Sequence, residues 1–155
     1  MPQSPWIPRR RWPSSTGAYV ILVRLDVPVT VNVNRLGYPV LPIGIYGYCG
    51  SARGPGGLDA RLARHHRSTK SRHWHVDHLT SVGAIIHTVA LPGGDECSCV
   101  VALTAMPKVV QPVSGFGSSD CRHCHAHLVA FPTNWPVSDL ISSVNLALSG
   151  EQIPD

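Results

Sequence analysis

The chain has 155 residues, 43% of them hydrophobic, and a formal net charge of +4 at pH 7 with its nine histidines neutral. This length accommodates one domain with a hydrophobic core of its own, which excludes a small scaffold that depends on disulfides. Because no stretch of about 18 apolar residues occurs, we expect neither a membrane-spanning helix nor a membrane partner.

The N-terminal segment, residues 1–16, is rich in proline, serine and arginine. It lacks the apolar run that follows the basic residues of a signal peptide. We therefore predict a disordered basic arm here, one domain over 17–131, and a C-terminal tail over 132–155.

Three apolar runs predict strands that pair in one sheet, at residues 18–25, 43–49 and 83–91. Alternating valines predict a half-buried strand at 29–33, and a short closing strand is expected at 127–131.

Helical spacing predicts a first helix that begins within two or three residues of Leu58, and a short helix within 72–79. Asp95 is the expected N-cap of a helix that starts at Glu96. The tail contributes one weak amphipathic turn, formed by Leu140, Ile141, Val144 and Leu148. The whole pattern predicts a single α/β domain with a small mixed β-sheet flanked by helices.

The first predicted helix turns an arginine toward its apolar face. Leu58, Leu62 and His65 fall at i, i+4 and i+7, and Arg61 lies on the same face. A guanidinium cannot lose its charge, so in this position it needs an anion or a wet cleft. A strand, a glycine turn and this helix suggest a phosphate site. The alternative is an arginine that extends to the rim of the apolar stripe.

Basic side chains gather around the same helix. Besides Arg61, residues 53–72 hold five of them against the single carboxylate of Asp59, namely Arg53, Arg64, Arg67, Lys70 and Arg72. Such a patch suits a polyanion, nucleic acid above all, and we expect these five side chains to contact backbone phosphates. A solvated basic face without a partner is the alternative.

Several motifs, taken in order, resemble the GIY-YIG nuclease superfamily. They are Gly17-Ala18-Tyr19 on the first strand, the run Tyr48-Cys49-Gly50-Ser51-Ala52 after the second apolar run, and Leu58, Arg61 and His65 on the helix. Residues 73–79, Glu96-Cys97 and residues 115–121 narrow the resemblance to the Uri-type endonuclease branch. A literal Gly44-Ile45-Tyr46 lies on the second strand, but the family brings its two tyrosines from neighbouring strands.

The resemblance implies a GIY-YIG-like domain that hydrolyses phosphodiester bonds of nucleic acid, with DNA as the expected substrate and DNA repair as the setting. The implied catalytic groups are Tyr19, Tyr48, Arg61 and Glu96, and His65 on the same helix is the next candidate from its chemistry. Arg61 would clamp the phosphate, a tyrosine or His65 would move a proton, and Glu96 would hold Mg²⁺ or Mn²⁺. We expect the two tyrosines, Arg61 and Glu96 to line one solvent-open concavity. The alternative is a tyrosine cluster packed in a sheet, with Glu96 as an ordinary first-turn carboxylate.

Thiols and imidazoles form a second cluster near the C-terminal end of the domain. Cys121, Cys124 and His127 are each separated by two residues, and Cys97 is a candidate fourth ligand for zinc. The alternative is a set of buried cysteines beside a histidine-rich turn. We favour this alternative because the chain has no second Cys-x-x-Cys pair.

The five cysteines are an odd number with no secretory signal before them. This favours a reducing compartment, and so a cytoplasmic location, over a disulfide framework. Two further functions stay open beside the nuclease: a non-catalytic nucleic-acid-binding module, and a zinc-stabilised interaction protein. The oligomeric state cannot be read from these patterns.

Overall fold

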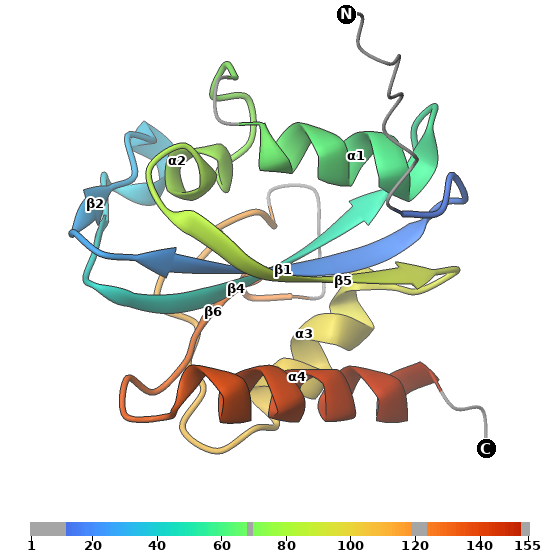
Figure 1. The fold of residues 1–155 in the computed structure, drawn as a ribbon. Helices are drawn as coiled ribbons and strands as arrows, with labels where there is room; N and C mark the ends of the chain where they lie inside the picture. Colours follow the sequence, from blue (N-terminus) through green and yellow to red (C-terminus); the bar gives the residue numbers. More distant parts are fainter. Residues whose placement is uncertain (1–11, 68–69, 119–123, 153–155) are drawn as a thin grey trace, which may run out of the picture.

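A four-stranded sheet between two layers of helices forms the domain (Figure 1). The computed structural model describes residues 12–67, 70–118 and 124–152, with side chains up to Ser149. The sheet has the order β5-β1-β4-β6, with strands β1 (Gly17–Leu25), β4 (Gly44–Ala52), β5 (Ala84–Pro92) and β6 (Leu128–Ala130). The predicted α/β class and the pairing of the three apolar runs in one sheet are therefore confirmed.

The strand pairings in this sheet are all antiparallel, whereas the sequence suggested a mixed sheet. The reason lies in the connection from β1 to β4. It holds only a small sheet of β2 (Val29–Thr30) with β3 (Val40–Leu41) and a 3₁₀ turn, η1 (Asn34–Leu36). A parallel return would need a crossover helix, which this segment lacks. The strand predicted at 29–33 is only two residues long, Val29–Thr30.

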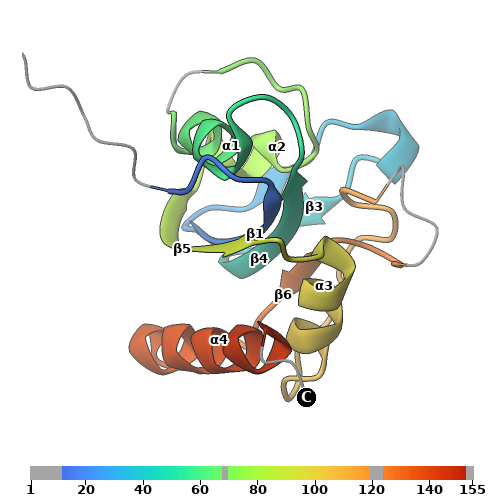
Figure 2. The same cartoon turned by 90° about the vertical axis from the view of Figure 1, so that its right-hand side faces the viewer.

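Helices cover both faces of the sheet. Helices α1 (Gly57–His66) and α2 (Asp77–Thr80) lie on one face, and α3 (Glu96–Thr104) and α4 (Val137–Gln152) lie on the other. The turned view in Figure 2 shows the same three layers. Helix α1 begins where the sequence predicted, and Asp95 caps α3 by accepting the Ser98 N–H at 2.9 Å.

The central strand β1 contributes to two cores. Tyr19, Ile21 and Val23 belong to the core under α1, and Ala18 and Val20 belong to the core under α3 and α4. Successive side chains of a strand point to opposite faces, so a strand that is apolar throughout suits burial on both sides.

The segment predicted as a C-terminal tail holds a 16-residue helix in place of one weak turn. Leu140, Val144 and Leu148 are buried in the second core. They recur at i, i+4 and i+8, which is a stripe two turns long and anchors the helix to α3 and the sheet. Among the described residues, no helix is both long and apolar enough to cross a membrane.

The end of the predicted disordered arm is an ordered part of the domain. Leu58 N–H donates to Ser15 O at 2.9 Å, and Asp59 N–H donates to Pro13 O at 2.8 Å. Trp12 N–H in turn donates to the Asp59 carboxylate at 3.3 Å. Residues 12–16 therefore satisfy backbone donors that the first turn of a helix otherwise leaves unpaired. The rest of the arm lies outside the described residues.

Candidate active site and metal centre

Two tyrosines and a histidine meet beneath α1. Tyr19 lies opposite Gly50 in the β1–β4 register, so Tyr48 shares its face of the sheet, and the two ring centroids are 6.3 Å apart. The Tyr19 hydroxyl lies 2.6 Å from Nε2 of His65, which points down from α1. The tyrosine pair expected from neighbouring strands is thus brought together, and Tyr46 instead donates its hydroxyl to Pro42 O at 2.6 Å.

Two glycines make room for these rings. A Cβ atom on Gly50 would lie 2.4 Å from the Tyr19 hydroxyl oxygen, and one on Gly117 would lie 2.7 Å from the ring of Tyr48. Gly117 also has a positive φ of 71° and donates its N–H to Nδ1 of His75 at 2.8 Å. Only glycine fits both requirements at Gly117. From the sequence, His75 was expected only to add a donor beside the basic patch, and its contact with Gly117 was not predicted.

The tyrosines are buried, which differs from the expected solvent-open concavity. Tyr19 is 1% exposed and Tyr48 is 8% exposed. Phe116 packs edge-on against Tyr48, and Trp74 packs against His65, so aromatic rings close this side of the site. Of the predicted site residues, Arg61 and Glu96 are partly accessible to solvent.

Burial keeps the three groups neutral. It raises the pKa of the phenols of Tyr19 and Tyr48, because a charged phenolate would lose its solvation. Burial likewise lowers the pKa of His65 to about 3, and the positive charge of Arg61 adds to this shift. Nδ1 of His65 has no hydrogen-bond partner among the described residues. Tyr19 and His65 therefore share a hydrogen bond between two neutral groups, away from bulk water.

Arg61 lies at the edge of this cluster and opens onto a pocket. Its Nη1 donates to Ser51 O at 2.9 Å, and its guanidinium lies 4.3 Å from the ring centroid of Trp74. A pocket of about 130 Å³ is lined by Arg61 together with Arg64 and Arg67. A small pocket lined by three arginine residues suits an anion such as phosphate.

Two members of the predicted basic patch have partners within the chain. Arg64 forms two hydrogen bonds to the buried Asp77 carboxylate, at 2.9 and 3.0 Å. Lys70 donates to the carbonyl oxygens of His65 and Arg67, at 2.9 and 2.7 Å, which caps the end of α1. The patch therefore has a carboxylate partner from outside its own stretch of sequence, because α2 brings Asp77 beneath it.

Asp77 organises the segment that precedes it in the chain. Its carboxylate also accepts the N–H groups of His73 and Trp74, each at 2.8 Å. Although burial alone would raise the pKa of Asp77, Arg64 and these N–H groups hold it below its ordinary value. The remaining patch members, Arg53, Arg67 and Arg72, are exposed. Arg53 lines a separate pocket with Thr16, Gly17, Gly93 and Gly94.

Glu96 lies between the tyrosine cluster and the cysteine cluster. It is the first residue of α3, and its side chain is 25% exposed. Its Oε2 lies 3.6 Å from Nδ1 of His127. After burial, which is the main cause, its negative charge further raises the pKa of Tyr19 and of Tyr48. The two groups of residues that the sequence suggested separately therefore share this carboxylate as a neighbour.

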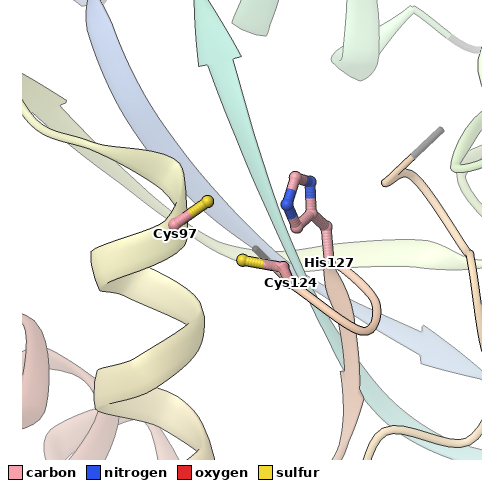
Figure 3. A group of neighbouring side chains, drawn as sticks. All are labelled: Cys97, Cys124 and His127. Carbon is pink, nitrogen blue, oxygen red and sulfur yellow. The ribbon is translucent and has the colours of Figure 1, made fainter. Parts of the chain in front are cut away.

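Cys97, Cys124 and His127 form a group that could hold a metal ion. One ligand atom from each lies within 4.8 Å of the others, and Figure 3 shows the two sulfur atoms and the imidazole turned toward one another. This spacing is slightly wider than the 4 Å or so expected around a bound zinc. His127 is 2% exposed, and neither of its ring nitrogens has a hydrogen-bond partner among the described residues.

Three of the four predicted zinc ligands are thus close together in space, although the sequence favoured cysteines that are merely buried. The segment before β6 brings Cys124 and His127 next to the first turn of α3, which carries Cys97. Cys121, the fourth candidate, lies outside the described residues. Thiolate and imidazole ligands suit zinc, whereas Mg²⁺ prefers oxygen ligands.

A comparison with protein-family models finds one match: residues 18–149 fit the model described as a domain of unknown function, DUF123. The match spans all four strands of the sheet and most of α4, which agrees with the place of α4 in the core. Neither the curated proteins nor the solved structures that were compared contain a match to the chain.

Proposed function

We propose that this chain, which belongs to the DUF123 family, is a metal-dependent endonuclease that hydrolyses phosphodiester bonds in DNA. The observation that carries the proposal is the buried hydrogen bond of 2.6 Å between Tyr19 and His65, whose neighbour Arg61 also lines a small pocket. The motif order that resembles the GIY-YIG nucleases supports the same activity and suggests a setting in DNA repair.

Each group has a distinct task in this proposal. The arginine pocket binds a backbone phosphate, and Arg61 neutralises the charge that grows on it in the transition state. The Tyr19–His65 pair holds a proton within reach of the attacking water or the leaving oxygen. Trp74 keeps the guanidinium of Arg61 in place, because the cation stacks on its ring.

Glu96 is the residue that would hold a divalent ion. Its carboxylate is partly exposed and next to the tyrosines, and oxygen ligands of this kind suit Mg²⁺ or Mn²⁺. When bound, the ion would supply charge neutralisation at the phosphate. Separately, we propose zinc as the metal of the Cys97–Cys124–His127 site, because soft sulfur and imidazole ligands favour it over Mg²⁺.

A plasmid-nicking assay in Mg²⁺ or Mn²⁺ tests the activity. The expected result is conversion of supercoiled to open-circular DNA by the wild-type protein and a loss of at least ~100-fold in Arg61→Ala. Arg24→Ala is the matched control, because Arg24 pairs with Asp26 on the surface instead of lining the pocket. Equal rates for all three proteins would assign the cleavage to a contaminant.

A non-catalytic nucleic-acid-binding module is the second candidate, and the burial of both tyrosines favours it. In that case the exposed arginines would bind DNA, while Tyr19, Tyr48 and His65 would only pack the core. DNA binding with no cleavage on supercoiled, branched or single-stranded substrates, with either metal, would favour this second function.

A further inference from the structure

We propose that zinc bound by Cys97, Cys124 and His127 fixes the position of Glu96 through His127, so that the two sites are coupled. Both cysteines and His127 act as ligands, and Glu96 accepts a hydrogen bond from the ligating imidazole. The consequence for cleavage rests on the proposed function, whereas the zinc site and its link to Glu96 do not.

The two nitrogens of His127 carry the argument. The ring is 2% exposed, and neither nitrogen has a hydrogen-bond partner among the described residues. Buried polar atoms are nearly always satisfied, so a pair of orphans on one ring needs an explanation. Nδ1 faces Oε2 of Glu96 at 3.6 Å, which leaves Nε2 for a metal. A zinc ion on Nε2 and a short approach of the carboxylate to Nδ1–H would satisfy both atoms.

This arrangement follows a general pattern of metal sites. A ligating histidine almost always donates its second ring N–H to a carboxylate or a carbonyl, which fixes its tautomer and its ring orientation. Glu96 is the carboxylate in that position, and its neighbour in sequence, Cys97, supplies a ligand from the same turn of α3.

The backbone holds both sides of the site in place. His127 N–H donates to Phe116 O at 2.8 Å, and Cys49 N–H donates to His127 O at 2.9 Å, so His127 is fixed between a loop and the sheet. On the other side, Asp95 accepts both the N–H and the hydroxyl of Ser98, at 2.9 and 3.1 Å, which fixes the first turn of α3. Zinc would join these two rigid segments.

Glu96 connects this metal site to the tyrosines. Its charge acts on the phenols of Tyr19 and Tyr48, and Oε2 faces His127. With Oε2 engaged by the imidazole, Oε1 is the oxygen that remains for a divalent ion at the proposed cleavage centre. Loss of zinc would free the carboxylate to rotate, so Glu96 would no longer present this oxygen in one position.

The first experiment measures metal in the full-length protein. We expect about one zinc per chain by elemental analysis, and a cobalt-substituted protein with the intense near-ultraviolet band of thiolate-to-cobalt charge transfer. Cys124→Ser should lose zinc and weaken that band. Cys49→Ala is the control, because Cys49 is a buried thiol of β4 that does not belong to the ligand group. Wild-type protein that takes up neither zinc nor cobalt at this site would overturn the proposal.

The second experiment measures the coupling without using activity. Zinc affinity is determined by competition with a chromophoric chelator in wild type, Glu96→Gln and Asp95→Asn. We expect Glu96→Gln to weaken zinc binding by ~10-fold to 100-fold, as loss of a partner to a ligating histidine does. Asp95→Asn removes the same charge one residue earlier and keeps a good N-cap, so its affinity should stay within about 2-fold of wild type. Equal affinities in all three proteins would overturn the coupling.

Cleavage assays then separate this proposal from the proposed function. If the protein cuts DNA, Cys124→Ser should cut at least ~10-fold more slowly while its affinity for DNA is unchanged. If the protein cuts no DNA under any condition, the proposed function fails, but the zinc stoichiometry and the effect of Glu96→Gln still decide this inference. A Cys124→Ser protein that is zinc-free, folded and as active as wild type would refute the link to cleavage.

Discussion

The hydroxyl of Tyr19 lies 2.6 Å from Nε2 of His65, and both side chains are 1% exposed. Burial disfavours the charged form of each, so this pair is a neutral hydrogen bond at pH 7. The hydrogen bond is shielded from bulk water, and transfer of its proton between the two partners would create two buried charges that this environment disfavours.

Tyr19→Phe should reduce both stability and cleavage. It removes the hydroxyl and leaves Nε2 of His65 buried without a partner, which costs about 1–3 kcal/mol of unfolding free energy. If Tyr19 takes part in proton transfer, cleavage should fall by ~10² or more. Tyr46→Phe is the control, since it removes a hydroxyl from the same face of the sheet, and within the described part of the chain that hydroxyl donates to Pro42 O alone. Urea unfolding and plasmid nicking measure the two effects, and equal nicking by both variants would remove Tyr19 from the catalytic set.

Arg61→Ala should lower cleavage much more than stability. The loss of one guanidinium from the transition state is worth about 3 kcal/mol, or ~100-fold in rate. The fold should persist because Arg61 makes only one hydrogen bond to the backbone, at Ser51 O, among the described residues. Circular dichroism checks the fold, and single-turnover kinetics measure the rate. A variant that unfolds would show that Arg61 is chiefly structural.

Arg64 and Arg67 line the same pocket but should behave differently when they are replaced by alanine. Arg64→Ala leaves the buried Asp77 carboxylate without its cation, so unfolding free energy should fall by about 3 kcal/mol.

Arg67→Ala removes an exposed charge, so stability should be unchanged while the slope of log affinity for DNA against log salt decreases by about 1. Fluorescence anisotropy at several salt concentrations measures that slope. An unaltered slope in Arg67→Ala, together with Arg53→Ala and Arg72→Ala, would exclude the exposed patch as a phosphate contact.

Stability should depend on pH through His65. Its folded pKa is about 3, below the ordinary value near 6.5, so the unfolded chain takes up a proton that the folded protein refuses. This contribution to stability is complete above pH 6.5 and is lost as the pH falls toward 3, by about 1.4 kcal/mol per pH unit. Comparison of wild type with His65→Gln between pH 5 and 6.5 isolates the effect from that of the carboxylates. Parallel stability curves for the two proteins would show that His65 is not buried as a neutral imidazole.

The sequence predicted the strands and helices that local residue patterns define. It did not predict the contacts between segments that are distant in the chain. The strands β1, β4 and β5 and the start of α1 follow from apolar runs and helical spacing. The pairing of Arg64 with Asp77 joins two helices through a connecting loop, and no local rule predicts it. The approach of His127 to Glu96 likewise depends on how β6 enters the sheet.

Two other features of the structure, the length of α4 and the burial of the tyrosines, could have been predicted from sequence patterns. Leu140, Val144 and Leu148 recur at i, i+4 and i+8, which predicts a helix of more than one turn. Burial of the tyrosines could have been expected from β1, because a strand that is apolar on both faces is covered on both faces. Its covering helix, α1, closes the cavity that the motif resemblance suggested.

The hydrogen bonds between residues 12–16 and α1 make the N-terminal segment a support for the helix that carries Arg61. Two carbonyl groups of this segment hold the first turn of α1, and the next turn carries Arg61. The position of the helix that carries Arg61 therefore depends on two hydrogen bonds from this segment. A chain shortened to begin at Gly17 would lose both hydrogen bonds, so the first turn of α1 would fray. The position of Arg61 would then become less well defined, although the sheet would stay intact.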